Sequence, residues 1–203
     1  MRTQTKETQE NLTPDQALEI LKHGNERFAK NLKTQRDLYA QVIETSLGQF
    51  PFAVILSCID ARVPAELIFD QGIGDIFSVR VAGNIVNEDI LGSIEYGCNV
   101  AGAKIVIVLG HTKCGAVTAA CKDVELGNIT LLLNKIKPAV NAIKKGNNAL
   151  DDDAIESVAI ENIRHSINRI KNESPILAEM AQSGRIKIVA ASYNVANGVV
   201  SYL

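Results

Sequence analysis

Short apolar runs alternate with stretches of helical periodicity along most of the chain. Four runs have the length and composition of buried strands: residues 52–57, 75–80, 104–109 and 185–191. The run at 104–109 is continuous and rich in β-branched residues, as expected of a strand that is covered on both faces. The closing segment, 193–203, is a candidate edge strand.

Helices are predicted between these strands, over residues 88–101, 128–145 and 151–171. A further short helix begins at Ser174-Pro175, and Gly146-Asn147-Asn148 is a predicted loop. Alternation of strands and helices favours an α/β fold with a mainly parallel central sheet of four to five strands, flanked by helices. No linker or repeat interrupts residues 1–203, so we expect a single domain.

An N-terminal helical arm, residues 1–48, precedes the first strand. Thr13 is a predicted N-cap, Pro14 suits the first helical position, and Gln16 completes a capping box. Apolar residues then form one stripe along the helix, at Leu18, Leu21, Phe28 and Leu32. Because no strand precedes the arm, this stripe must pack either on its own domain or on a second subunit.

Composition and charge exclude some function classes. A formal net charge of −2 over 203 residues gives no bulk attraction to nucleic acid or to an anionic membrane. No apolar run approaches the roughly 20 residues of a membrane helix, and residues 1–11 lack the apolar core of a signal peptide. We therefore expect a cytoplasmic protein that binds neither nucleic acid nor membrane.

Three residues that are common metal ligands follow predicted strands. Cys58 comes directly after the first strand, and His111 and Cys114 follow the third. Sites in open α/β sheets are built at such strand ends. Two thiolates and an imidazole suit Zn²⁺, and the fourth position is left for Asp60 or water, as in catalytic zinc sites. The other two cysteines, Cys98 and Cys121, are interpreted as buried small hydrophobes.

Asp60 and Arg62 are a candidate catalytic pair beside this site. Two residues apart on an extended segment, their side chains point to the same side. An arginine partner keeps a carboxylate ionised and fixes its direction. A plain structural ion pair is the alternative interpretation.

The glycine-rich segments do not match a phosphate-binding or dinucleotide-binding motif. Gly72-Ile73-Gly74 lacks a third glycine and a preceding strand. The segment from Gly110 to Gly115 follows a strand, but Ala116-Val117 stands where a P-loop has Lys-Ser/Thr. Neither segment therefore has the sequence context of a dinucleotide-binding or phosphate-binding loop.

The two motifs C-x-D-x-R, at 58–62, and H-x-x-C, at 111–114, together resemble the β-class carbonic anhydrases. The run from Arg80 to Asn84 and the segment Gly110–Gly115 extend the similarity. The resemblance implies reversible hydration of CO₂ to bicarbonate and a proton, by attack of a zinc-bound hydroxide. It also implies a homodimer or homotetramer that dimerises partly through the N-terminal helices, which favours a second subunit for the apolar stripe of the arm.

In that family the pair matching Asp60 and Arg62 is a switch: when the arginine releases the carboxylate, Asp60 takes the fourth metal position. The resemblance also implies a substrate pocket. Gln49 would donate its amide to an oxygen of CO₂ or bicarbonate, and Gly115 matches a backbone position beside the metal. Phe77, Ala82 and Tyr96 match apolar pocket positions, some of which face the neighbouring subunit.

The chain also departs from the family pattern. Ile59 and Ala61 stand where serine is common, and Ile55 stands where some bacterial members use Trp in a regulatory bicarbonate pocket. We expect that pocket to be absent or altered, with Arg80, which matches an Arg of the pocket, pairing structurally instead. Two other functions stay open: hydrolysis of carbonyl sulfide or carbon disulfide on the same metal site, and a closed zinc site without catalysis.

Overall fold

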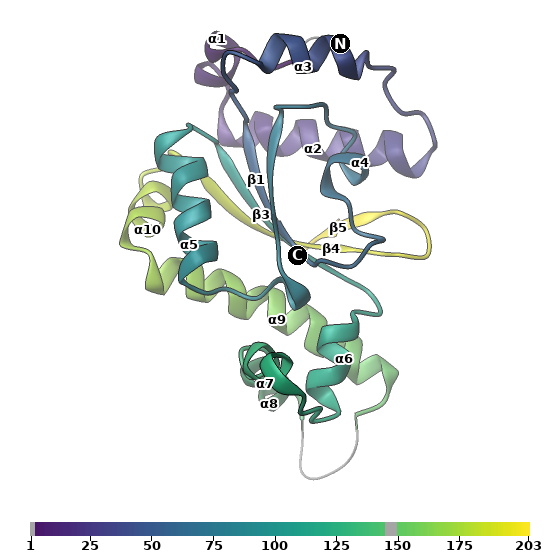
Figure 1. Cartoon of the computed structure of the whole chain (residues 1–203). Coiled ribbons are helices and arrows are strands. Elements are labelled where there is room, and N and C mark those ends of the chain that lie inside the picture. Colours follow the sequence, from purple (N-terminus) through teal and green to yellow (C-terminus); the bar gives the residue numbers. More distant parts are fainter. Residues whose placement is uncertain (1–2, 145–149) are drawn as a thin grey trace.

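The computed structural model describes residues 3–144 and 150–203. Its centre is a five-stranded sheet with the strand order β2-β1-β3-β4-β5 (Figure 1). The strands are β1 (Ala53–Ser57), β2 (Ile76–Arg80), β3 (Ile105–His111), β4 (Lys187–Tyr193) and β5 (Val200–Tyr202). The first four are parallel and β5 is antiparallel to β4. The α/β class, the mainly parallel sheet and the closing edge strand are therefore confirmed.

Helices cover both faces of this sheet. The helices of the described residues are α1 (Lys6–Glu10), α2 (Pro14–Ala29), α3 (Leu38–Thr45), α4 (Ala65–Ile68), α5 (Glu88–Glu95), α6 (Gly115–Cys121), α7 (Gly127–Leu133), α8 (Lys137–Ile143), α9 (Asp152–Glu173) and α10 (Pro175–Gln182). A 3₁₀ turn, η1 (Ala82–Asn84), follows β2, and a π-helical turn, η2 (Tyr96–Val100), follows α5. Helices α2 and α4 pack on one face, and α5, α9 and α10 on the other (Figure 1).

Alternate side chains of the central strands enter two different cores. Ile55 and Ile107 pack with α2 on one face, whereas Val54 and Val106 pack with α5 and α9 on the other. All residues of β1 and β3 are buried. Burial of both faces explains why these strands are continuous apolar runs in the sequence rather than alternating ones.

Helix α2 packs closely against its own sheet. Its predicted capping box is present, with Thr13 accepting from the Gln16 amide and Gln16 accepting from that of Thr13. Leu21 is fully buried in the core of the chain, so the preference for a second subunit as the surface under this stripe is wrong for α2. Leu32, beyond the helix, is 65% exposed.

Two neighbouring residues fix the close approach of α2 to the end of α4. At Gly24, an added Cβ would lie 1.8 Å from the carbonyl oxygen of Phe69, so only glycine fits there. The next residue, Asn25, is buried and donates to the carbonyls of Ile68 (3.1 Å) and Gly198 (2.9 Å).

A buried carboxylate ties the segment after α2 to the same region. Asp70 is 2% exposed at its side chain and accepts from Arg27 Nε and Arg36 Nη1, each at 2.6 Å. Burial alone would raise the pKa of Asp70, but these two guanidinium groups hold it at about 2.

The single helix predicted over 128–145 is wrong in the structure, because α7 and α8 are separate. Pro138 lies in the first turn of α8, where its missing N–H is harmless. In one continuous helix its ring would clash with the carbonyl of Asn134. The end of that predicted helix, at Lys145, and the predicted loop Gly146-Asn147-Asn148 lie outside the described residues.

The other helix predictions are confirmed. Asp151 caps α9 by accepting from the Ala154 amide, and Ser174 caps α10. The helix predicted over 88–101 is present as α5, and its last turn is the π-helical η2. Cys98 in η2 is buried, as predicted, whereas Cys121 is only partly buried.

Candidate metal centre

Three predicted ligands meet at the carboxyl end of the parallel sheet. Cys58 follows β1, His111 is the last residue of β3, and Cys114 is the N-cap of α6. Their ligand atoms all lie within 4.8 Å of one another, and all three residues are buried. The Sγ atoms of Cys58 and Cys114 are 4.0 Å apart. Parallel β1 and β3 end side by side, which brings these distant motifs together.

The two ring nitrogens of His111 have different surroundings. Its Nδ1 lies 2.9 Å from the carbonyl oxygen of Thr112. A carbonyl only accepts, so Nδ1 carries the proton and Nε2 presents a lone pair. Nε2 is buried and has no hydrogen-bond partner among the described residues. A buried acceptor facing two sulfur atoms fits a tetrahedral metal such as Zn²⁺.

The electrostatics of the two thiols also fit a cation. The adjacent Cys114 thiol lowers the pKa of Cys58 against the effect of burial, helped by His111 and the Gly83 amide. Cys58 and burial in turn raise the pKa of Cys114. A thiolate at Cys58 therefore opposes a second one at Cys114, and a bound cation would allow both to ionise.

Asp60 and Arg62 form the predicted pair beside the three ligands. Arg62 donates Nε to Oδ1 at 2.9 Å and Nη2 to Oδ2 at 2.8 Å, a bidentate arrangement. These bonds hold the pKa of Asp60 far below its usual range. Oδ2 of Asp60 lies 3.9 Å from Nε2 of His111, so the carboxylate borders the metal centre while Arg62 holds it.

Arg80 has a structural role, as expected from the sequence. Its Nε donates to the carbonyl of Cys58 at 3.1 Å, and its Nη2 donates to the carbonyl of Asp60 at 2.7 Å. The guanidinium at the end of β2 therefore anchors the segment that carries the first ligand and the Asp60 carboxylate.

The residues predicted to bind substrate lie at different distances from the ligands. Gly115 directly follows Cys114 at the start of α6, and Ala82 lies in η1. Gln49 is exposed on the segment before β1.

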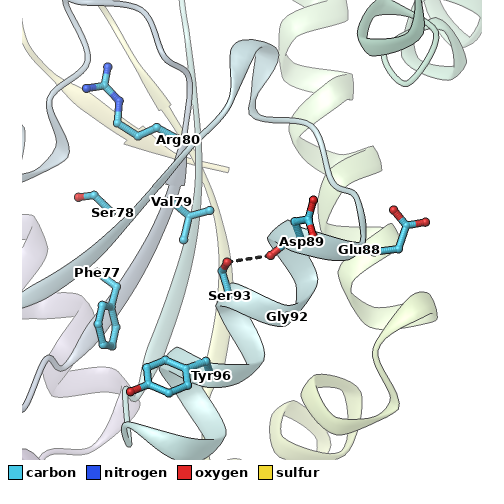
Figure 2. Close-up of a pocket in the computed structure, with 9 residues that line it drawn as sticks. All are labelled: Phe77, Ser78, Val79, Arg80, Glu88, Asp89, Gly92, Ser93 and Tyr96. Carbon is cyan, nitrogen blue, oxygen red and sulfur yellow. Dashed lines mark hydrogen bonds between the residues drawn. The ribbon is translucent and has the colours of Figure 1, made fainter.

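Phe77 and Tyr96 lie on a separate groove of about 750 Å³ between β2 and α5. Figure 2 shows the two rings beside each other, and they form an edge-to-face pair with centroids 6.2 Å apart and planes at 65°. The lining of the groove includes neither Cys58 nor the other two ligands, and Tyr96 is 55% exposed. Within the described part of the chain, this groove therefore lies apart from the three ligands.

Three contacts that support the ligands were not predicted from the sequence. The Gly83 amide donates to Sγ of Cys58 at 3.3 Å, and Asn162 donates to the Gly83 carbonyl at 2.8 Å. Glu156 accepts from the Lys113 amide at 2.7 Å, within the H-x-x-C segment. One signal was available for Asn162, since it interrupts the apolar face of α9 with a polar side chain.

Comparisons with known proteins agree with this geometry. The family model described as "Carbonic anhydrase" matches residues 53–200. Carbonic anhydrase 2 of Mycobacterium tuberculosis is 33% identical over 195 residues, which cover 93% of this chain and 92% of that protein. The crystal structure of the β-carbonic anhydrase CafA of Aspergillus fumigatus superposes with a TM-score of 0.74 at 25% identity, covering 81% of each chain.

A relative with a different substrate is also similar. The carbon disulfide hydrolase of Acidithiobacillus thiooxidans is 29% identical over 147 residues, covering 64% of this chain and 65% of that protein.

A parallel sheet with a Cys-His-Cys centre at its carboxyl edge defines the class of site, a candidate metal centre on an α/β fold. The chain belongs to the β-class carbonic anhydrase family and is an enzyme of that class. Among the described residues, none of the helices combines the length and the apolar character needed to span a bilayer.

Proposed function

We propose that this enzyme catalyses the reversible, zinc-dependent hydration of CO₂ to bicarbonate and a proton. The observation that carries the proposal is the buried Nε2 of His111, which has no hydrogen-bond partner among the described residues. It lies with the sulfur atoms of Cys58 and Cys114 beside the Asp60–Arg62 pair. Three soft donors with an adjacent carboxylate are what a catalytic zinc site with an exchangeable fourth position needs.

When bound, a zinc ion at this centre supplies a Lewis acid that lowers the pKa of a water molecule. Asp60 accepts a hydrogen bond from the attacking oxygen and directs its lone pair toward the carbon of CO₂. Arg62 keeps Asp60 ionised, so the carboxylate remains an acceptor. The thiolates of Cys58 and Cys114 offset the charge of the metal, so activity rises toward alkaline pH more than for a three-histidine site.

We also propose a homodimer or homotetramer, with the active site completed between subunits. Two observations support this proposal. Strand β2 lies at the edge of the sheet, and α3 exposes the apolar side chains of Leu38, Tyr39, Val42 and Ile43. A partner subunit would cover the exposed ring of Tyr96, consistent with a role for Phe77 and Tyr96 in the pocket of the neighbouring subunit. A cytoplasmic location remains a prediction.

Hydrolysis of carbonyl sulfide or carbon disulfide is the second candidate function, favoured by the similarity to the carbon disulfide hydrolase. The same centre could attack each of these linear molecules at carbon, so the ligands do not discriminate between them. A closed zinc site without catalysis is less consistent with the structure, because Arg62 holds Asp60 by two hydrogen bonds rather than releasing it.

The test is stopped-flow hydration of CO₂ by zinc-loaded protein, between about pH 6.5 and 9. The proposal predicts fast turnover that rises with pH, and slower turnover of carbonyl sulfide and carbon disulfide by the same preparation. Turnover of only the sulfur compounds would move the assignment to the hydrolases. Absence of turnover on all three substrates at full zinc occupancy would support the closed site.

A further inference from the structure

Asn162 on α9 is a buried polar residue with one clear contact. It is 1% exposed, and its Nδ2 donates to the carbonyl of Gly83 at 2.8 Å. Its Oδ1 is buried without a hydrogen-bond partner among the described residues. A buried acceptor without a partner destabilises a fold relative to an apolar side chain of similar shape. An asparagine at this position therefore needs a reason other than stability.

Gly83 connects this helix to the metal centre. On its carbonyl side Gly83 is held by Asn162, and on its amide side it donates to Sγ of Cys58 at 3.3 Å. Its backbone has φ 68° and ψ 20°, in the left-handed region that favours glycine. Because glycine has little conformational preference of its own, a side chain from another element is needed to hold its amide toward the sulfur.

The neighbouring bond from α9 offers a natural comparison. Ser166, one helical turn after Asn162, donates to the carbonyl of Asn84 at 3.0 Å. Both side chains are buried and both hold η1, but only the Asn162 bond ends on the residue whose amide reaches Cys58. A comparison of variants at these two positions therefore distinguishes a general anchoring of η1 from a specific effect on Cys58.

We propose that Asn162 is a positioning residue of the metal centre, which holds Gly83 so that its amide donates to the Cys58 thiolate. A hydrogen bond to a metal-bound sulfur fixes its orientation and reduces the charge it gives to the metal. Asn162 thereby tunes the affinity for zinc and the electronic character of the zinc–sulfur bond. The proposal rests on the proposed zinc site but not on CO₂ as the substrate.

The experiment compares Asn162→Leu with Ser166→Ala as the matched control. Zinc affinity is measured by competition with a chromophoric chelator, and the thiolate-to-metal charge-transfer band is recorded on cobalt-substituted protein. We expect Asn162→Leu to bind zinc about 10- to 100-fold more weakly and to shift the band. Ser166→Ala should leave both unchanged. Equal effects in the two variants, or no effect in Asn162→Leu, would overturn the proposal.

A measurement on the unaltered protein covers the case in which Asn162→Leu does not fold. In protein loaded with ¹¹³Cd, the Gly83 amide proton should show scalar coupling to the metal through Sγ of Cys58, and its absence would contradict the proposed contact. Since no readout uses CO₂, a protein that binds zinc without hydrating CO₂ would refute the proposed function and leave this inference standing.

Discussion

Replacing Arg62 with alanine separates the catalytic role of the Asp60–Arg62 pair from its contribution to stability. The side chains of Arg62 and Asp60 are 51% and 18% exposed. Solvent screening therefore keeps the loss of unfolding free energy small. Catalysis should suffer far more, because Asp60 loses both side-chain bonds from Arg62 and keeps only the bond from the Arg62 amide to Oδ1, at 2.9 Å. Its Oδ2, which lies 3.9 Å from Nε2 of His111, can then approach the metal.

We expect Arg62→Ala to lower kcat for CO₂ hydration about 100-fold, since a misplacement of roughly 1 Å can have an effect of that size. The assay is stopped-flow hydration at matched zinc content, together with urea unfolding. Arg164→Ala is the control, because Arg164 forms an exposed ion pair with Glu161 on α9, at 3.3 Å and with 58% and 30% exposure. It should lose similar stability and no activity.

Two outcomes would refute this reasoning. The first is a kcat of Arg62→Ala within threefold of the unaltered enzyme, and the second is an equal loss of activity in Arg164→Ala. The double variant Asp60→Ala/Arg62→Ala adds a further test. If the pair acts as one unit, it should be no slower than Asp60→Ala alone, whereas fully additive losses would mean that the two residues act separately.

The remaining predictions concern the fold and the ligands. Gly24→Ala should destabilise the protein by about 3 kcal/mol in urea unfolding, because its Cβ would meet the Phe69 carbonyl at 1.8 Å; Gly92→Ala, with nothing within 4 Å, should instead stabilise α5 by about 0.5–1 kcal/mol. Equal effects of the two changes would show that α2 packs differently. Asp70→Asn should cost about 2 kcal/mol at pH 7, and most of that difference should be lost as the pH falls from about 5 to 2, since folding lowers the pKa of Asp70 to about 2; an undiminished difference at pH 2 would contradict this. Cys58→Ser should lose zinc, measured as metal content after dialysis, and retention of a full equivalent would remove Cys58 from the ligand set.

Much of this fold could be predicted from the sequence, because strands that are buried on both faces of the sheet have continuous apolar runs. The strands containing Ile55 and Ile107 were predicted to within one or two residues for that reason. The break between α7 and α8 was missed although Pro138 marks it, because the apolar periodicity continues on both sides. The sequence did not show whether the apolar stripe of α2 packs on its own domain or on a second subunit. The answer depends on the fit of Gly24 against the carbonyl of Phe69, which is distant in the chain.

The candidate metal centre was predictable for a related reason. Parallel strands end at one edge, so Cys58 and His111 could be expected to meet from their places after β1 and β3. The contacts that support the ligands could not be predicted. Asn162 and Glu156 reach the metal centre from α9, and the sequence does not specify how this helix is rotated on the sheet. Phe77 and Tyr96 were named as pocket residues only through the family resemblance, and they line a groove whose lining does not include the three ligands.

Titration of metal-free protein with zinc, with CO₂ hydration measured at each addition, tests the central claim most directly. The account predicts that the rate rises with added zinc and stops at one equivalent per chain, and that His111→Ala shows no rise. A full equivalent of bound zinc without CO₂ hydration, or a His111→Ala variant that reaches the same rate, would contradict it.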